Sequence, residues 1–325
     1  MKTDSRFYLL AGLLGASLVF GNTTRAAEPV ATPAADAPAP PQRLFATPDD
    51  AVKALLAATR DHDKPVLREI FGPHGRELVS GDKVADAREF ADFAQALAQL
   101  CRLSPAGPDK MVLNIGAQDW PFPIPLVYQN GKWFFDTLAG KEEIINRRVG
   151  GNEITAIGVC RTYVEAQREY ASQERDNSGV LKYAQKIKST AGQKDGLFWE
   201  PAAGEDPSPF GPLVASARAE GYGPRKPGEE GPRPFHGYLF RILTKQGAHA
   251  PGGAYDYVIN GNMIAGFALV AYPVQWGDSG VMTFIVNQQG RVYQANLGPD
   301  TAAKAAALTE FDPDSTWTVL PAGQR

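Results

Sequence analysis

The spacing of apolar residues changes between helical and strand-like along this chain, and this change restricts the possible folds more than any other feature of the sequence. Apolar residues recur at helical spacing between residues 48 and 103, and residues 110–135 read as strands. A second helical stretch, residues 141–172, precedes a second group of strands within residues 237–294. Because helices come first and an antiparallel meander follows, instead of the two alternating one by one, the sequence predicts an α+β fold.

The first half is expected to form three helices and then an antiparallel sheet. Thr47 can cap the first helix, with Pro48 at its first position and two Asp residues near its positive end. The expected helices are residues 48–59, 65–71 and 86–103, and the expected strands are residues 110–115, 122–128 and 132–135. Asn130 and Gly131 predict a two-residue hairpin turn, because both residue types accept a positive φ.

The second half is expected to begin with a long helix over residues 141–172. We predict a break at Gly150 and Gly151, because paired glycines weaken a helix. Residues 201–237 hold 8 Pro and 7 Gly and are expected to be mostly loop, with one short helix near residues 213–219. The later strands are expected at residues 237–243, 254–259, 267–273, 281–286 and 292–294, and a short helix at 301–308.

The N-terminus has the three-part form of a secretory signal peptide, residues 1–26. Two basic residues precede an uncharged apolar run of 14 residues, and Thr24 and Ala26 are the small residues expected before a cleavage site. The run is shorter than the roughly 20 residues that span a bilayer, and its retention as an anchor is the alternative to cleavage. We therefore expect an exported protein of the periplasm or cell envelope, without a transmembrane helix in the mature chain.

The predicted domain organisation follows from these segments. The Ala/Pro-rich composition of residues 27–44 predicts an extended tether. Residues 45–146 are expected to form the first α+β domain. Residues 147–325 are expected to hold the long helix, the Gly/Pro loop region and a C-terminal antiparallel β domain.

Composition excludes several classes of protein. The chain has 33 Lys and Arg against 36 Asp and Glu, whereas a nucleic-acid-binding protein needs a basic excess, so no nucleic acid partner is expected. A hydrophobic content of 43% is too high for disorder over the whole chain. The four His residues show no ligand spacing, so no metal site and no cofactor are expected.

Four long stretches of the second half carry a resemblance to a known family. They are GNEITAIGVCRTYVEAQREYAS, FHGYLFRILTKQGAHAPGGAYDYVINGNMIAGFALVAYP, GDSGVMTFIVNQQGRVYQANLGPDT and FDPDSTW. Together they resemble the DUF2950 family of bacterial envelope proteins, whose function is unknown. The resemblance covers about residues 45–320 and implies no catalytic residue and no cofactor.

Two fold-level likenesses refine the expected architecture. The order of elements in the first half, ending in NGKWFFDT, is similar to the cone-shaped NTF2-like scaffold. The long helix, Gly/Pro loop and strands of the second half resemble the globular heads of type IV pilins and pseudopilins, where a helix packs on an antiparallel sheet. This chain lacks the pilin processing site, so the likeness implies a shared head architecture and not a filament subunit.

An NTF2-like cone would offer a pocket between its helices and its concave sheet. The candidate ligand-binding residues there are Asp119, Trp120, Tyr128, Trp133 and Asp136. A carboxylate beside a Tyr in an apolar pocket can transfer protons. The alternative is that the tryptophans belong to the core and that the two carboxylates lie at strand ends.

The sequence GDSG at residues 277–280 resembles the nucleophile loop of trypsin-like proteases, with His249 as a conceivable base. Only 30 residues separate His249 from Ser279, and Val281 stands where a second Gly is expected. Gly, Asp and Ser are ordinary turn residues, so we favour a hairpin turn and assign no catalytic residue.

Cys101 and Cys160 could form a disulfide, since export leads to an oxidising compartment. Both lie in expected amphipathic helices, where Cys also serves as a small buried apolar residue, so both alternatives stay open. From the sequence we expect a non-catalytic envelope protein that binds or assembles with an unknown envelope protein or small ligand. The alternative is a periplasmic ligand-binding protein or enzyme that uses the NTF2-like pocket.

Overall fold

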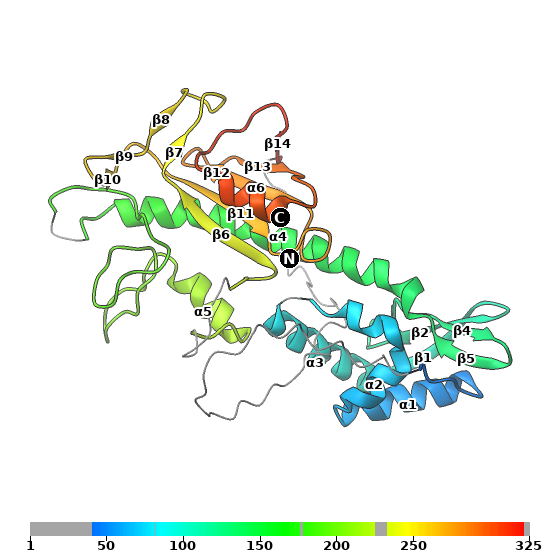
Figure 1. Cartoon of the computed structure of the whole chain (residues 1–325). Coiled ribbons are helices and arrows are strands. Elements are labelled where there is room, and N and C mark those ends of the chain that lie inside the picture. The colour runs from blue at the N-terminus through cyan, green and yellow to red at the C-terminus, as the bar shows by residue number, and fades with distance from the viewer. Residues whose placement is uncertain (1–40, 81, 176–177, 225–232, 322–325) are drawn as a thin grey trace, which may run out of the picture. The chain divides into compact units, whose positions relative to one another are not determined.

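The computed structural model describes residues 41–80, 82–175, 178–224 and 233–321. The predicted signal peptide and most of the predicted tether lie outside these residues. The described chain forms helices and antiparallel sheets, which confirms the α+β class (Figure 1). It divides into two compact units, here called unit 1, which ends at Asn146, and unit 2, which begins at Arg147.

Unit 1 begins with helices whose starts are fixed by side-chain caps. They are α1 (Pro48–Arg60), α2 (Lys64–Phe71), a 3-10 helix (Pro73–Leu78) and α3 (Lys83–Gln99). Thr47 accepts a hydrogen bond from the Asp50 backbone, Asp63 caps α2, and Asp82 caps α3. These short polar side chains satisfy N–H groups that have no partner within the helix, as the sequence predicts for Thr47.

The sheet of unit 1 has the strand order β1-β2-β4-β5, with β3 paired to β2. The strands are β1 (Cys101–Gly107), β2 (Lys110–Ile115), β3 (Trp120–Pro121), β4 (Leu126–Gln129) and β5 (Lys132–Phe135). Asn130 and Gly131 have φ values of 51° and 77°, which confirms the predicted hairpin turn. The prediction of a helix as far as residue 103 is wrong, because α3 ends at Gln99 and Leu103 pairs with Leu113 in the sheet.

Aromatic side chains fill the interior of unit 1 between its helices and its sheet. Phe93 stacks on Phe122 with their ring centroids 5.3 Å apart, and Phe71 and Phe135 complete the group. All four side chains are buried in one apolar cluster. Their burial supplies much of the hydrophobic stabilisation of this unit.

A single helix, α4 (Thr137–Ala171), runs through the boundary between the units. The predicted break at Gly150 and Gly151 is therefore wrong. Ile144 packs in the core of unit 1, and Tyr163 packs in the core of unit 2. Packing of this kind can outweigh the roughly 1 kcal/mol that each helical glycine costs. Among the described residues, no helix is both long enough and apolar enough to cross a bilayer.

Unit 2 is built on a sheet of order β14-β13-β12-β11-β6. The strands are β6 (Tyr238–Leu243), β11 (Ala268–Pro273), β12 (Thr283–Asn287), β13 (Val292–Ala295) and β14 (Thr318–Val319). Helix α4 packs against this sheet, and Tyr163 donates a hydrogen bond to the Ala268 carbonyl (Figure 1). Arg241 of β6 donates to the last carbonyls of α6 (Thr301–Ala307), which also contacts β11. Cover by both helices explains why β11 is almost continuously apolar.

Smaller elements complete unit 2. They are α5 (Gly211–Ala219), β7 (Lys245–Gln246), β8 (Tyr255–Asp256), β9 (Val258–Ile259) and β10 (Asn262–Met263). The single strand predicted at residues 254–259 is divided, because Tyr257 turns into the core and its backbone binds Thr244 and Ile264. Asn260 and Gly261 form the tight turn between β9 and β10, with the positive φ values of 48° and 80° that such a turn requires.

Candidate functional site

Two of the five candidate ligand-binding residues of unit 1 come together. Tyr128 and Trp133 pair across the β4–β5 hairpin, with ring centroids 5.2 Å apart. Tyr128 is 40% exposed, so this side of the hairpin is accessible to solvent. Trp120 lies on β3 and packs against the apolar cluster of unit 1. Trp120 and Trp133 are both partly buried, so they contribute to the packing of this unit.

The two candidate carboxylates have contacts of their own. Asp119 forms an exposed ion pair with Arg102 of β1. Asp136 accepts a hydrogen bond from the Ala139 backbone and so caps the first turn of α4. In the described part of unit 1, no hydrogen bond joins either carboxylate to Tyr128, and the pocket stays a prediction.

The GDSG loop is a turn that hydrogen-bonds to itself between β11 and β12, which confirms the turn interpretation. The Ser279 hydroxyl donates to the Gln275 carbonyl at 3.1 Å and accepts from the Gln275 N–H at 3.0 Å. Ser279 is only 4% exposed, and His249 pairs with Asp312 instead, with 2.9 Å between Nδ1 and Oδ2. The protease-like sequence therefore serves the fold.

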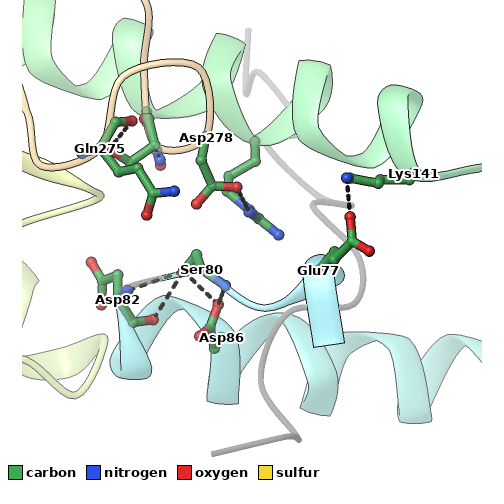
Figure 2. A network of polar contacts seen from close by, with 10 residues as sticks. Glu77, Ser80, Asp82, Asp86, Lys141, Gln275 and Asp278 are labelled. Atoms are coloured by element: carbon green, nitrogen blue, oxygen red, sulfur yellow. Dashed lines mark hydrogen bonds and ion pairs between the residues drawn. The ribbon is translucent and has the colours of Figure 1, made fainter. Parts of the chain in front are cut away.

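Three side chains of α4 hold this loop in place. Arg148 donates to Asp278 at 2.7 Å, and Asn152 donates to the Ser279 carbonyl at 2.9 Å (Figure 2 shows Asp278 and Gln275 of the loop). Glu153 accepts two backbone N–H bonds, both 2.9 Å long, from the residues that follow the loop. These contacts span about 130 positions of sequence, which is why local patterns did not reveal them.

The two cysteines lie in different units. Cys101 begins β1, whereas Cys160 is buried in the core of unit 2, and both are free thiols in the structure. Burial raises the pKa of Cys101 to about 11 and that of Cys160 to about 12, so neither is a reactive thiolate at neutral pH. Across the described ranges, no three His, Cys, Asp or Glu side chains lie close enough to hold a metal ion.

A concave surface of unit 2 consists of two adjoining cavities, here called the Trp199 groove. Lys194, Trp199 and Glu205 line both cavities, whose volumes are about 590 and 940 Å³. The first also includes Glu169 and Arg175 at the end of α4 and beyond it. The second continues along the loop that starts at Lys188 and reaches α5 (its further wall residues include Thr190, Phe198, Val214, Arg218 and Tyr222). Sites for small molecules commonly have volumes of this order.

Cations flank the aromatic rings of the groove. The Arg175 guanidinium lies 5.3 Å from the centre of the Trp199 ring, and the Lys194 ammonium lies 5.6 Å from it. Arg218 lies 5.4 Å from the Phe198 ring. Such contacts contribute about 0.5–1 kcal/mol each at exposed sites and orient both partners. The groove therefore offers flat apolar surfaces beside fixed charges.

Two polar groups in the wall of the first cavity lack a partner. Trp199 Nε1 and Ser208 Oγ are buried, and within the described residues neither makes a hydrogen bond. An unsatisfied buried donor costs about 1–3 kcal/mol, so its presence calls for an explanation. Lys194 and Glu205 form an exposed ion pair of 3.3 Å beside them, and such a pair costs little to separate.

A hydrogen-bonded loop forms one wall of the second cavity. Asp195 accepts bonds from the Thr190 backbone and hydroxyl and from Lys186. Burial alone would raise the pKa of Asp195, but these hydrogen bonds outweigh it and lower the pKa to about 2. Asp195 is therefore ionised, and able to accept these bonds, at any pH well above that value.

Comparison with known proteins places the chain in a family. The sequence profile of the family described as protein of unknown function (DUF2950) matches residues 42–320. The chain belongs to the DUF2950 family. This confirms the resemblance carried by the four sequence stretches. No curated protein and no solved structure matches the chain.

DUF2950 membership assigns no site residue, so the groove rests on geometry alone. No local pattern of the sequence indicates it, because its wall residues come from α4, the loop that follows and α5. The one usable signal was the adjacent pair Phe198 and Trp199, two large rings placed just before a Pro-rich stretch. In this DUF2950 chain Trp199 takes its cationic partners from the segment after α4, Arg175 and Lys194, and Phe198 takes Arg218 from α5.

Proposed function

We propose that this chain is an exported protein of the bacterial cell envelope that acts by binding, not by catalysis, with the Trp199 groove as its binding surface. The observation that carries the proposal is the pair of adjoining cavities around Trp199, whose ring has two cations within 5.6 Å of its centre. Rings beside fixed charges suit a ligand or partner segment that carries both apolar and charged groups.

Export is supported by the signal-like residues 1–26 and by the Ala/Pro-rich tether that follows them. For the finer architecture we propose an NTF2-like unit 1 and a pilin-head-like unit 2. The support is the order of elements, helices before an antiparallel sheet in unit 1 and a long helix packed on a sheet in unit 2.

The binding role is also supported by what the polar groups do. Ser279, His249 and Asp136, which could suggest catalysis in the sequence, all make contacts that hold turns and a helix end. The Ser279 hydroxyl in particular is buried and bonded within its own turn, so it is poorly placed to attack a substrate.

The proposal is tested first by fractionation and then by native mass spectrometry of the protein purified from its own compartment. We expect a cleaved, periplasmic chain that retains a small ligand or a peptide. Lys194→Ala and Trp199→Phe should weaken retention at least tenfold, and Trp276→Phe, outside the groove, should not. Uncleaved protein in the cytoplasm would contradict export, and equal retention by the groove variants and wild type would contradict the groove.

A further inference from the structure

We propose that unit 2 has a second site, which binds a phosphate group between three arginines. Arg161 and Arg168 of α4 and Arg291, just before β13, line one cavity of about 300 Å³. This cavity shares no residue with the Trp199 groove, so the two sites can be tested independently.

The fold explains why these three side chains meet. Arg161 and Arg168 lie about two helical turns apart and therefore on one face of α4. The turn before β13 rests on that face, because a Cβ added to Gly290 would lie 3.8 Å from Val164 and 3.9 Å from Arg168. Arg168 also donates to the Gln288 carbonyl at 3.0 Å. The turn therefore places the backbone of Arg291 beside α4.

Charge at the cavity points to an anion. Three guanidinium groups face a single carboxylate, that of Glu165, so the lining carries a net charge of +2. The whole chain has a net charge of −3, so this cluster does not follow from a general basic excess. Like charges gathered in one cavity repel one another unless an anion lies between them. A phosphate dianion matches the excess charge.

The donors favour phosphate over a carboxylate. A guanidinium presents five N–H donors in a planar fork that fits two oxygens at once. Arg168 uses one of its donors for Gln288, and in the described part of the chain Arg291 has no hydrogen bond or ion pair. Three such groups, from a helix and a strand end, can address three oxygens, which a phosphate ester offers and a carboxylate does not.

Two sources can supply this group, a soluble phosphate ester or the headgroup of an anionic lipid. Val164, Val292 and Leu320 form apolar wall beside the arginines, which would accommodate a short carbon chain in either case. The test therefore has one arm for each source.

In the first arm, calorimetry measures binding of inorganic phosphate and glycerol phosphate to the mature chain. In the second, sedimentation measures binding to vesicles of phosphatidic acid, whose headgroup is a phosphate monoester, or of phosphatidylcholine, whose headgroup is a zwitterionic diester. Arg291→Gln and Arg168→Gln should each weaken binding at least tenfold. Arg291→Lys should weaken binding less than Arg291→Gln does, because lysine keeps the positive charge and loses only the planar fork of N–H donors. Arg60→Gln, which removes an exposed charge in unit 1, should bind like wild type.

Binding in the first arm identifies a soluble ester, and binding to phosphatidic acid vesicles alone identifies a headgroup. Circular dichroism of each variant shows whether it is folded, and Arg291 is exposed, so Arg291→Gln should fold normally. The proposal is overturned if neither arm shows binding, or if Arg291→Gln and Arg168→Gln bind as tightly as Arg60→Gln does.

Discussion

Arg148 and Asp278 form an ion pair of 2.7 Å between α4 and the loop that joins β11 to β12, with the Arg148 side chain only 3% exposed. A buried pair of this kind couples the position of the loop to that of the helix. The loop carries the GDSG sequence that most resembles a catalytic element. Its polar residues are thus explained by attachment to α4.

Asp278→Asn should destabilise unit 2, because it leaves the Arg148 guanidinium buried beside a neutral partner. We expect the free energy of unfolding to fall by about 3 kcal/mol, the usual cost of breaking a buried pair. Urea denaturation followed by circular dichroism measures this loss. Asp61→Asn is the matched control, because its pair with Arg60 is exposed and contributes little. Equal stability of the two variants would show that the buried pair has no structural role.

The sequence predicted caps and turns correctly where a single residue type determines the local backbone conformation. Thr47 caps α1 as expected, and the turn at Asn130 and Gly131 has the positive φ values expected of it. The chemistry of such positions lies within a few residues of chain, so a single sequence contains it.

The secondary-structure predictions were wrong where contacts between residues far apart in the sequence determine the local conformation. Gly150 lies inside α4 although glycine disfavours helices, and Leu103 pairs with Leu113 in a sheet although the preceding residues are helical. The Trp199 groove was missed for the same reason, since its rings are partnered by Arg175, Lys194 and Arg218 from separate segments.

Gly150→Ala should stabilise the protein, because α4 is continuous and an added Cβ at Gly150 meets no atom within 4 Å. The expected gain is about 0.5–1 kcal/mol, from the better helix propensity of Ala. Thermal unfolding measures it as a rise in Tm. Gly280→Ala is the contrasting variant and should lower stability. Its Cβ would overlap the hydroxyl of Tyr238, which donates to the Met282 carbonyl. Loss of stability in Gly150→Ala would indicate that the helix is broken there after all.

Thiol titration should find two free cysteines and no disulfide. In the native protein Cys160 should not react with a thiol reagent at pH 8, because it is fully buried and its pKa is raised to about 12. Cys101, which is partly exposed, should react slowly, because burial raises its pKa to about 11. Both should react at once in denaturant without reductant, and a need for reductant would reveal a disulfide. Cys160→Ala identifies which of the two thiols reacts slowly.

His249 should titrate above its ordinary pKa of 6.5. The hydrogen bond that the His249 ring donates to Asp312 raises the pKa of His249 most, and the negative charge of Asp312 adds to this effect. A raised pKa in the folded state means that protonation stabilises the contact below pH 6.5, and that this stabilisation is lost as pH rises through the folded pKa. NMR titration of the His249 ring measures the shift. Asp312→Asn should return the pKa toward 6.5, whereas Asp61→Asn in unit 1 should leave it unchanged. A His249 pKa at or below 6.5 in the wild-type protein would contradict the His249–Asp312 contact.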